Sequence, residues 1–401
     1  MVVAAAVPPS LMPAILTSAA CVDCGSGHTG VHFYTTSADG VQQRARAGLK
    51  HADGGNLPVT DSLTGTGDFA EFIDQLSQVL SRQHSADGVT PDILFVGATG
   101  GVRAALKDGK INESRLDAFR AALVRAFEGQ MRVVKFEVVT GVQEAEWELE
   151  AAQAIWGQKA SEMFPTTAAL QGVVVPTTAL GPVEQAAADS MSRAPTHADL
   201  PSLAIAPQSM GLFSGGGQSM QLGRSGSAPL SFPFSTFPPE MEERQGASPD
   251  AWLDDDIWGR WAERLAATVQ QEATRHERFD GCYVGTAMNH RAAMFCEIAE
   301  VPLTAGAAAA ALRAALPQFR GREGALYERM MATKLGGPNY PLARITAMHT
   351  YRLATVLEHM FAPEAKLFFA RNGVDAAGQP IDCEWTVGAF VAEARSLVEA
   401  Q

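Results

Sequence analysis

The sequence predicts an α/β protein with mixed β-sheets that carry helices on both faces. Segments with strand-like and helix-like patterns alternate along the chain, which is typical of this class. Two halves of the chain each open with a strand, a Gly-rich turn and a second strand, so we expect two related domains. The 401 residues, 46% of them hydrophobic, suffice for about two or three cores of ordinary domain size.

The first half begins with two predicted strands over residues 14–36. A short apolar run precedes a stretch rich in Gly and Ser, and the β-branched and aromatic segment VHFYTT follows it. Hydrophobic residues then recur at helical spacing over 68–83, and the apolar run at 92–99 predicts a buried strand. The remaining elements of this half are a helix at 113–128, a strand at 132–139 and a helix from about Gln143.

The periodic pattern weakens between residues 151 and 208, where the run at 192–208 is rich in Pro, Thr and Ser. We expect a linker or insertion there. The second half then opens with three short strands over 210–233. Further predicted elements are a helix at 252–275, a strand at 280–287, helices at 288–316, 322–333 and 341–361, a strand at 366–370 and a closing helix at 386–399.

This order of elements predicts how the chain divides into domains. Residues 1–150 form the first domain, 151–208 the linker or insertion, and 209–385 the second domain. A C-terminal helix within 386–401 is expected to pack back on the first domain.

The charge balance excludes several classes of partner. The chain has 31 Lys and Arg against 44 Asp and Glu, a formal net charge of -13, so it offers no broad basic surface for nucleic acid or an anionic membrane. The charge balance does not exclude a small phosphorylated ligand, provided that a cation, an arginine or backbone amides neutralise the charge of that ligand.

Targeting and membrane signals are weak. No window holds about 18 consecutive apolar residues, so we predict no transmembrane helix. The apolar N-terminal stretch lacks the basic start of a signal peptide and is interrupted by Pro8, Pro9 and Pro13. Five cysteines, an odd number, are few for a disulfide scaffold. These features favour a cytoplasmic location.

Cys21 and Cys24 form a CxxC pair, a spacing found in redox and zinc sites. Positions three apart in a strand point to opposite faces, however, and the other cysteines supply no second pair for a four-cysteine zinc site. We therefore interpret the pair as structural and not as a redox or zinc site.

Gly-rich turns occupy corresponding places in the two halves, DCGSGHTG at 23–30 and SGGGQSM at 214–220. Glycines let backbone N–H groups converge on an anion, and the hydroxyls of Ser26, Thr29 and Ser219 add donors. Each turn alone is weak support, since most Gly/Ser clusters are loops, and neither matches a Walker or Rossmann motif.

Two further segments strengthen the phosphate hypothesis. GATGGVR at 97–103 follows a predicted strand and opens a helix, so its free N–H groups and Arg103 can meet a phosphate. TGVQEAEW at 140–147 places Glu144 in the first turn of a helix, where a carboxylate can deprotonate an attacking water. The alternatives are a surface ion pair for Arg103 and a solvated acidic helix start for Glu144. His349, in the helix predicted at 341–361, carries no site argument.

In this order, the segments resemble the apyrase family of nucleoside tri- and diphosphate hydrolases, within the actin-like superfamily. Residues 23–34 are similar to the family segment DAGSSGTRVHVY, 97–103 to GATAGMR, 140–147 to SGxEEGxYxW, and 214–222 to DLGGASTQI. The sister family of exopolyphosphatases and guanosine pentaphosphatases is similar at 143–146 and 285–293. The resemblance implies two ribonuclease-H-like domains flanking a cleft, a nucleotide or polyphosphate substrate, and a divalent metal, Mg or Ca.

The resemblance also implies roles for single residues. Glu144 would be the base for the nucleophilic water, Ser219 and Gln221 would help to position that water, and Asp23 would hold the metal through water. The implied phosphate-binding residues are Ser26, Gly27, His28, Thr29, Thr99, Arg103, Gly216, Gly217 and Gln218.

The chain departs from the family pattern at several positions. Ser214 stands where the family has an Asp, Gly30 replaces an Arg, Ala145 replaces a Gly, and residues 287–289 lack the Gly-Gly-Thr of the exopolyphosphatases. Three functions therefore stay open: a nucleoside phosphate hydrolase, an exopolyphosphatase or guanosine pentaphosphatase, and a catalytically weak nucleotide sensor.

Overall fold

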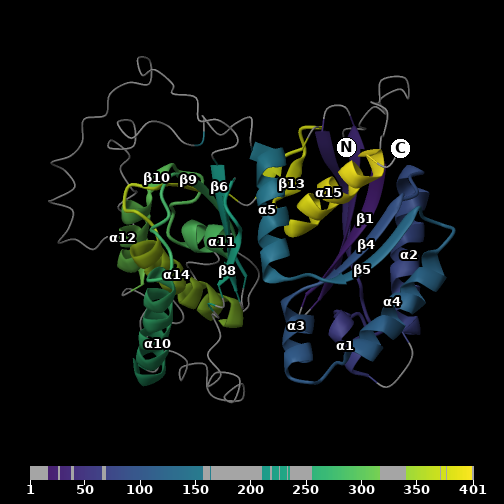
Figure 1. The fold of residues 1–401 in the computed structure, drawn as a ribbon, viewed down its shortest axis with the longest axis horizontal. Helices are drawn as coiled ribbons and strands as arrows, with labels where there is room; N and C mark the ends of the chain where they lie inside the picture. Colours follow the sequence, from purple (N-terminus) through teal and green to yellow (C-terminus); the bar gives the residue numbers. More distant parts are fainter. Residues whose placement is uncertain are drawn as a thin grey trace. The chain divides into compact units, whose positions relative to one another are not determined.

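A computed structural model gives the fold of the chain (Figure 1). It describes residues 17–25, 28–37, 40–65, 69–156, 163, 210–216, 219–224, 226–232, 234, 255–316, 340–370, 372–375 and 377–399. Contacts divide the chain into two compact units. The first unit comprises Met1–Ile155 with Asn372–Gln401, and the second comprises Trp156–Arg371.

The first unit is built on a five-stranded mixed sheet with strand order β3-β2-β1-β4-β5. Strands β1, β2 and β3 are antiparallel neighbours, and β1, β4 and β5 run parallel. The strands are β1 (Thr17–Cys24), β2 (Thr29–Ser37), β3 (Gly40–Gly48), β4 (Ile93–Ala98) and β5 (Val133–Val138). The helices are α1 (Val59–Thr64), α2 (Ala70–Asp87), α3 (Gly100–Lys107), α4 (Glu113–Phe127), α5 (Gly141–Trp156) and α15 (Trp385–Glu399), and β12 (Asn372–Val374) and β13 (Pro380–Asp382) form a hairpin.

Alternate residues of the central strands face opposite sides of this sheet. One set, which includes Val22 and Val96, shares a core with Phe72 of α2 and Phe119 of α4. On the other face, the Phe95 ring meets Trp147 of α5 edge-on at 5.5 Å. Helix α15 also packs against β1, so the C-terminal segment completes the first unit.

Cys21 and Cys24 fit this two-faced pattern. Cys24 belongs to the core shared with α2 and α4, whereas Cys21 faces the side where Glu393 of α15 lies. Both cysteines are free and buried, and burial raises the pKa of each thiol. The two side chains lie on opposite faces of the sheet, as the spacing predicts, and β1 extends to Cys24, which was expected in the turn.

The second unit repeats the same sheet plan with one additional edge strand. Its strand order is β10-β11-β9-β6-β7-β8, in which β6, β7 and β8 are antiparallel and β6, β9 and β11 are parallel. The strands are β6 (Met210–Gly215), β7 (Met220–Arg224), β8 (Leu230–Phe232), β9 (Cys282–Ala287), β10 (Leu303–Thr304) and β11 (Lys366–Phe369). The helices are α10 (Asp255–Ala273), α11 (Met288–Phe295), α12 (Ala305–Ala315) and α14 (Tyr340–Met360).

The structure confirms the predicted α/β class with two mixed sheets, and it differs from the predicted elements in several places. The single helix predicted at 288–316 is two helices with β10 between them, because Glu297 and Glu300 adopt positive φ angles and Pro302 follows. Strand β3, helix α1 and the hairpin of β12 and β13 were not predicted. The chain returns to the first unit at Asn372, whereas the expected domain boundary followed residue 385.

Some predictions lie outside the described residues. These are the helix at 322–333, the Pro-rich run at 192–208 and most of the linker at 151–208; the start of that linker, up to Trp156, continues α5. No helix in the described ranges is long and apolar enough to cross a membrane.

Candidate active site

Parallel pairing brings three strand ends together at one edge of the first sheet. Asp23, next to last in β1, lies opposite Gly97 of β4, and Gly97 lies opposite Glu137 of β5. The turns that follow β4 and β5 therefore begin beside Asp23. In open α/β sheets this carboxyl edge is where ligands bind.

The local sequence fixes where α5 begins. Thr140 Oγ1 accepts a hydrogen bond from the Gln143 backbone N–H at 3.1 Å, and Gln143 Oε1 accepts one from the Thr140 N–H at 3.0 Å. This reciprocal pair is a capping box, which satisfies two backbone donors at a helix start. Helix α5 consequently begins at Gly141, slightly before the predicted start, and Glu144 lies in its first turn.

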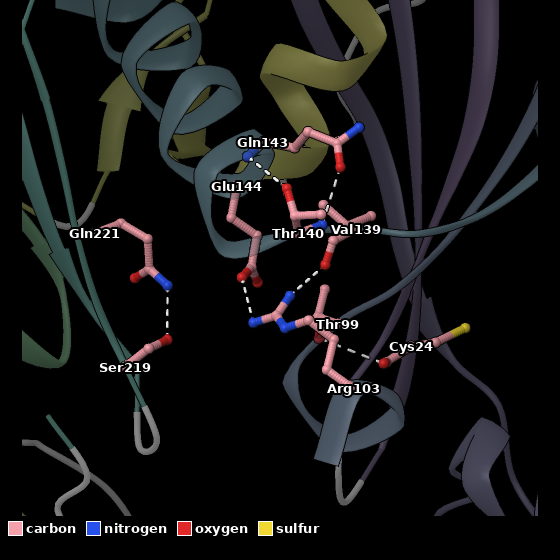
Figure 2. A network of polar contacts seen from close by, with 9 residues as sticks. All are labelled: Cys24, Thr99, Arg103, Val139, Thr140, Gln143, Glu144, Ser219 and Gln221. Carbon is pink, nitrogen blue, oxygen red and sulfur yellow. Dashed lines mark hydrogen bonds and ion pairs between the residues drawn. The ribbon is translucent and has the colours of Figure 1, made fainter. Parts of the chain in front are cut away.

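Glu144 and Arg103 form an ion pair (Figure 2). Arg103 Nη2 lies 2.8 Å from Glu144 Oε2, and Arg103 Nη1 donates to the Val139 carbonyl at the end of β5. The Glu144 side chain is 12% exposed and that of Arg103 is 27% exposed. The alternative of a solvated acidic helix start does not apply to Glu144, because its carboxylate is largely buried and paired.

The surroundings of Glu144 have two opposite effects on the pKa of its carboxyl group. Burial raises the pKa of the carboxyl, and the charge and hydrogen bond of Arg103 lower it, with burial the larger effect. A carboxylate with a raised pKa is a stronger base, while the guanidinium favours its ionised form. This combination suits a group that accepts a proton from water near neutral pH.

Asp23 lies in a crowded negative environment. Burial, with the charges of Glu384 and Glu144, raises the pKa of Asp23 to about 7, while the Trp385 indole N–H, a hydrogen-bond donor, lowers it. Its Oδ1 atom is buried and has no hydrogen-bond partner. An orphaned carboxylate oxygen near two other acidic groups fits a site for a cation, which would supply the missing positive charge.

The donor set fits a cation held through water. Within the described ranges, no group of three or more His, Cys, Asp or Glu side chains is placed to hold a metal ion directly. Small divalent ions such as Mg²⁺ commonly keep several waters and use one or two carboxylates. The water-mediated role of Asp23 stays a prediction, and Glu144 and Glu384 add to the negative field around it.

The expected phosphate-binding residues of the first unit are placed differently from one another. His28 is exposed at the turn between β1 and β2, whereas Thr29 is buried. Thr99 is buried, and its hydroxyl contacts the Cys24 carbonyl at 3.4 Å, which ties the end of β4 to β1. Ser26 and Gly27 lie outside the described residues. The Thr99 side chain makes no capping hydrogen bond at the start of α3, and backbone N–H groups at a helix start are donors that can meet an anion.

The second unit places its expected residues around the turn between β6 and β7. Gln221 Nε2 donates to Ser219 Oγ at 2.7 Å (Figure 2). The Gly216 N–H donates to the Ser219 carbonyl at 3.0 Å, so this amide closes the turn instead of facing a ligand. Gly217 and Gln218 lie outside the described residues.

Ser214 occupies in the second sheet the place that Asp23 has in the first. It is next to last in β6 and lies opposite Thr286 of the parallel strand β9, as Asp23 lies opposite Gly97. Ser214 is 2% exposed. The serine thus removes a buried carboxylate from the position that corresponds to Asp23.

Two groups of polar residues near these strand ends were missed by the sequence analysis. In the first unit, Glu384 and Trp385 follow β13, and Glu384 lies 3.2 Å from Arg46 Nη1. In the second unit, His349 and Arg352 of α14 are fully buried. The i, i+3 spacing of His349 and Arg352 within an apolar helix is the one signal in the sequence that could have indicated them.

The chain matches no protein-family model and no curated protein sequence. It is similar to solved structures over nearly its whole length. The type II variant of the Aquifex aeolicus Ppx/GppA phosphatase is 13% identical with a TM-score of 0.55, covering 94% of this chain and 99% of that one. A structure of nucleoside triphosphate hydrolases from Neospora caninum is 10% identical with a TM-score of 0.50, covering 94% and 92%. The chain therefore has the two-domain, actin-like α/β fold of the Ppx/GppA phosphatase structure.

Proposed function

We propose that this protein is a phosphoanhydride hydrolase that removes the terminal phosphate of nucleoside tri- and diphosphates. The observation that carries the proposal is the partly buried Arg103–Glu144 pair, which lies at the strand edge where Asp23 has an oxygen without a partner. Solved phosphatases and nucleoside triphosphate hydrolases with the same fold support the reaction class.

The reaction would proceed by attack of water on the terminal phosphorus. Glu144 accepts a proton from the water, the water oxygen bonds to phosphorus, and the bridging P–O bond breaks to release the shortened nucleotide. A divalent cation, when bound near Asp23, would neutralise phosphate charge. We further propose that Arg103 moves part of its hydrogen bonding from Glu144 to the substrate phosphate, and that Ser219 and Gln221 orient the water.

The phosphate-binding assignments rest on the backbone around both turns. The uncapped start of α3, which follows Thr99, supplies amides and the positive end of a helix dipole. In the first unit, we propose that the phosphate is also bound by Ser26, Gly27, His28 and Thr29. In the second unit, the proposed phosphate-binding residues are Gly216, Gly217 and Gln218. Gly216 would act by shaping the turn, since its N–H is already bonded.

A polyphosphate or guanosine pentaphosphate substrate is the second candidate. The similarity to the Aquifex aeolicus Ppx/GppA phosphatase favours it as strongly as the Neospora caninum structure favours nucleotides. A catalytically weak nucleotide sensor is the third candidate, favoured by Ser214 in the place that corresponds to Asp23.

Phosphate release from a panel of substrates separates these candidates. The panel contains ATP, ADP, guanosine tetraphosphate and polyphosphate, each assayed with magnesium, with calcium and with a chelator. We expect release from the nucleotides with a divalent ion and none with the chelator. Faster release from polyphosphate would favour the second candidate, and nucleotide binding without release would favour the sensor. Release that persists in the chelator would contradict the cation role given to Asp23.

A further inference from the structure

The second Gly-rich turn is attached to a buried arginine. Arg352 of α14 is 0% exposed, and its Nη2 donates to the Gly216 carbonyl at 2.6 Å. Its Nη1 donates to the Phe234 carbonyl. Both peptide groups of Gly216 are thereby fixed, because its N–H is bonded to the Ser219 carbonyl.

His349 and Asn289 continue this attachment. Arg352 Nη2 lies 2.7 Å from His349 Nδ1, and His349 Nε2 lies 3.0 Å from Asn289 Oδ1. A guanidinium can only donate, so Nδ1 accepts, and the imidazole proton resides on Nε2 and is donated to Asn289. Asn289 Nδ2 in turn donates to the Phe213 carbonyl in β6 at 3.0 Å. Arg352 and Asn289, joined through His349, thus bind the backbone on both sides of Gly215.

The fit between this cluster and the turn leaves no room at Gly215. A Cβ atom there would lie 2.6 Å from Asn289 Oδ1 and 2.9 Å from His349 Cε1. Real Cβ atoms do not approach other atoms so closely, so α11 and α14 come near the turn only because residue 215 is glycine.

The charge of Arg352 is unusual for its surroundings. No carboxylate in the described part of the chain pairs with it, and burial lowers its pKa to about 9, so it remains charged at neutral pH. Burying a charge without an opposite charge is costly. His349 adds no positive charge, because burial together with Arg352 and Arg291 holds its pKa well below the usual range. An anion bound at the turn would offset this cost.

We propose that Arg352, oriented by His349 and Asn289, fixes the backbone at Gly216, directly after β6, and places a fixed positive charge behind it for a bound anion. Arg352 is a positioning residue in this account, since it touches the turn and not the substrate. The identity of the anion as phosphate rests on the proposed function; the attachment of the turn does not.

Hydrogen exchange of the backbone amides in residues 210–224 tests the attachment. Arg352→Met keeps the length of the side chain and removes its donors, so we expect exchange in this segment to accelerate at least ten-fold. Arg352→Lys, which keeps a charge and a donor, should restore part of the protection. Arg313→Met is the matched control, because Arg313 also contacts α14, through Thr355, but pairs with Glu358 instead of the turn. Unchanged exchange in Arg352→Met would overturn the attachment.

Gly215→Ala provides a second test that leaves Arg352 in place and serves if Arg352→Met does not fold. The added methyl group should push the turn away from Asn289 and accelerate exchange in the same segment. Gly259→Ala in α10 is its control, because a Cβ there meets nothing within 4 Å. Equal exchange in Gly215→Ala and the wild type would contradict the close fit.

Inorganic phosphate is the probe for the charge. We expect Arg352→Met to raise the dissociation constant for phosphate at least ten-fold and Arg352→Lys to raise it less. An unchanged constant in Arg352→Met would overturn the electrostatic part of the inference. If the wild type binds neither phosphate nor nucleotide, the proposed function fails, while the exchange measurement still decides the attachment.

Discussion

Buried ionisable side chains carry the proposed chemistry at the residue scale, and their environments set their protonation. Burial raises the pKa of Asp23 and Glu144 and lowers that of His32 and His349. The acids thereby become better proton acceptors once ionised, and the histidines stay neutral. Each shift also links the stability of the fold to pH.

His32 gives the clearest prediction for acid conditions. It is 0% exposed, and burial with the charge of Arg46 lowers its pKa from 6.5 to about 3. The unfolded chain therefore takes up a proton between these pH values and the folded chain does not, so stability is fully present above pH 6.5 and is lost as the pH falls towards 3.

The loss is about 1.4 kcal/mol per pH unit at most, since one pKa unit corresponds to that free energy. His32→Phe, which keeps the ring stacked on Tyr34, should flatten the dependence of the unfolding free energy on pH between 6 and 4. Denaturant titrations at several pH values measure the unfolding free energy. His84→Gln is the control, because His84 is exposed. An equally steep dependence in His32→Phe would contradict the assignment.

Ser214 gives a prediction about the cation. Ser214→Asp restores a carboxylate in the place that corresponds to Asp23, where it is buried and costly without a counter-charge. We expect the variant to melt at a lower temperature than the wild type in a chelator and to gain more stability when magnesium is added. Thermal unfolding with and without magnesium measures both effects, and an equal gain in the two proteins would argue against the correspondence.

At the element scale, the C-terminal helix α15 supports the helix that carries Glu144. Trp385 stacks on Trp147 of α5 with ring centroids 5.8 Å apart, and the Trp385 ring fills the space that a side chain at Gly97 would need. A Cβ atom at Gly388 would lie 2.7 Å from Trp147 Cα, so the backbones of α15 and α5 are in direct contact. Helix α15 therefore helps to set the position of the proposed base.

Gly388→Ala tests this contact. In an open helix, alanine would stabilise by up to about 1 kcal/mol relative to glycine. At Gly388 the methyl group must push α15 from α5, so we expect a loss of about 1–3 kcal/mol, typical of overpacking. Chemical denaturation measures the change, and Gly259→Ala, in an open position of α10, should show the opposite sign. A stabilised Gly388→Ala protein would contradict the close approach.

The elements that the sequence predicts well are those whose pattern is local. β1, β4 and β9 are short runs of apolar residues, and α5 carries its own capping box. β3 was missed because it is an edge strand with no buried residue, and its two Gln and two Arg residues interrupt the apolar pattern.

The residues of the candidate site can likewise be predicted only where the signal is local in the sequence. Glu144 is indicated by its place after a strand at a helix start, but its partner Arg103 is 41 residues away and is brought near only by the pairing of β4 with β5. Arg352 is 136 residues from Gly216, and a charged residue in a helix ordinarily indicates the surface. Both contacts depend on the topology, which the local pattern does not contain.

At the scale of the whole molecule, one sheet plan occurs twice with different chemistry at corresponding places. The first unit has Asp23 at the end of its central strand and the Arg103–Glu144 pair beside it. The second has Ser214 at that place and a buried cation, Arg352, attached to its turn. A chain of net charge -13 would thus handle an anionic substrate through local positive groups and a divalent ion.

The central claim is that Glu144 activates water for attack on a terminal phosphate. Its most direct test is the rate of phosphate release by Glu144→Gln with a nucleotide and magnesium, measured beside nucleotide affinity. Glu146→Gln is the matched control, because Glu146 is exposed two residues further along α5. The account predicts a loss of about 100-fold or more for Glu144→Gln, with affinity retained and the control unaffected. An unchanged rate in Glu144→Gln would remove Glu144 from the mechanism and contradict the account.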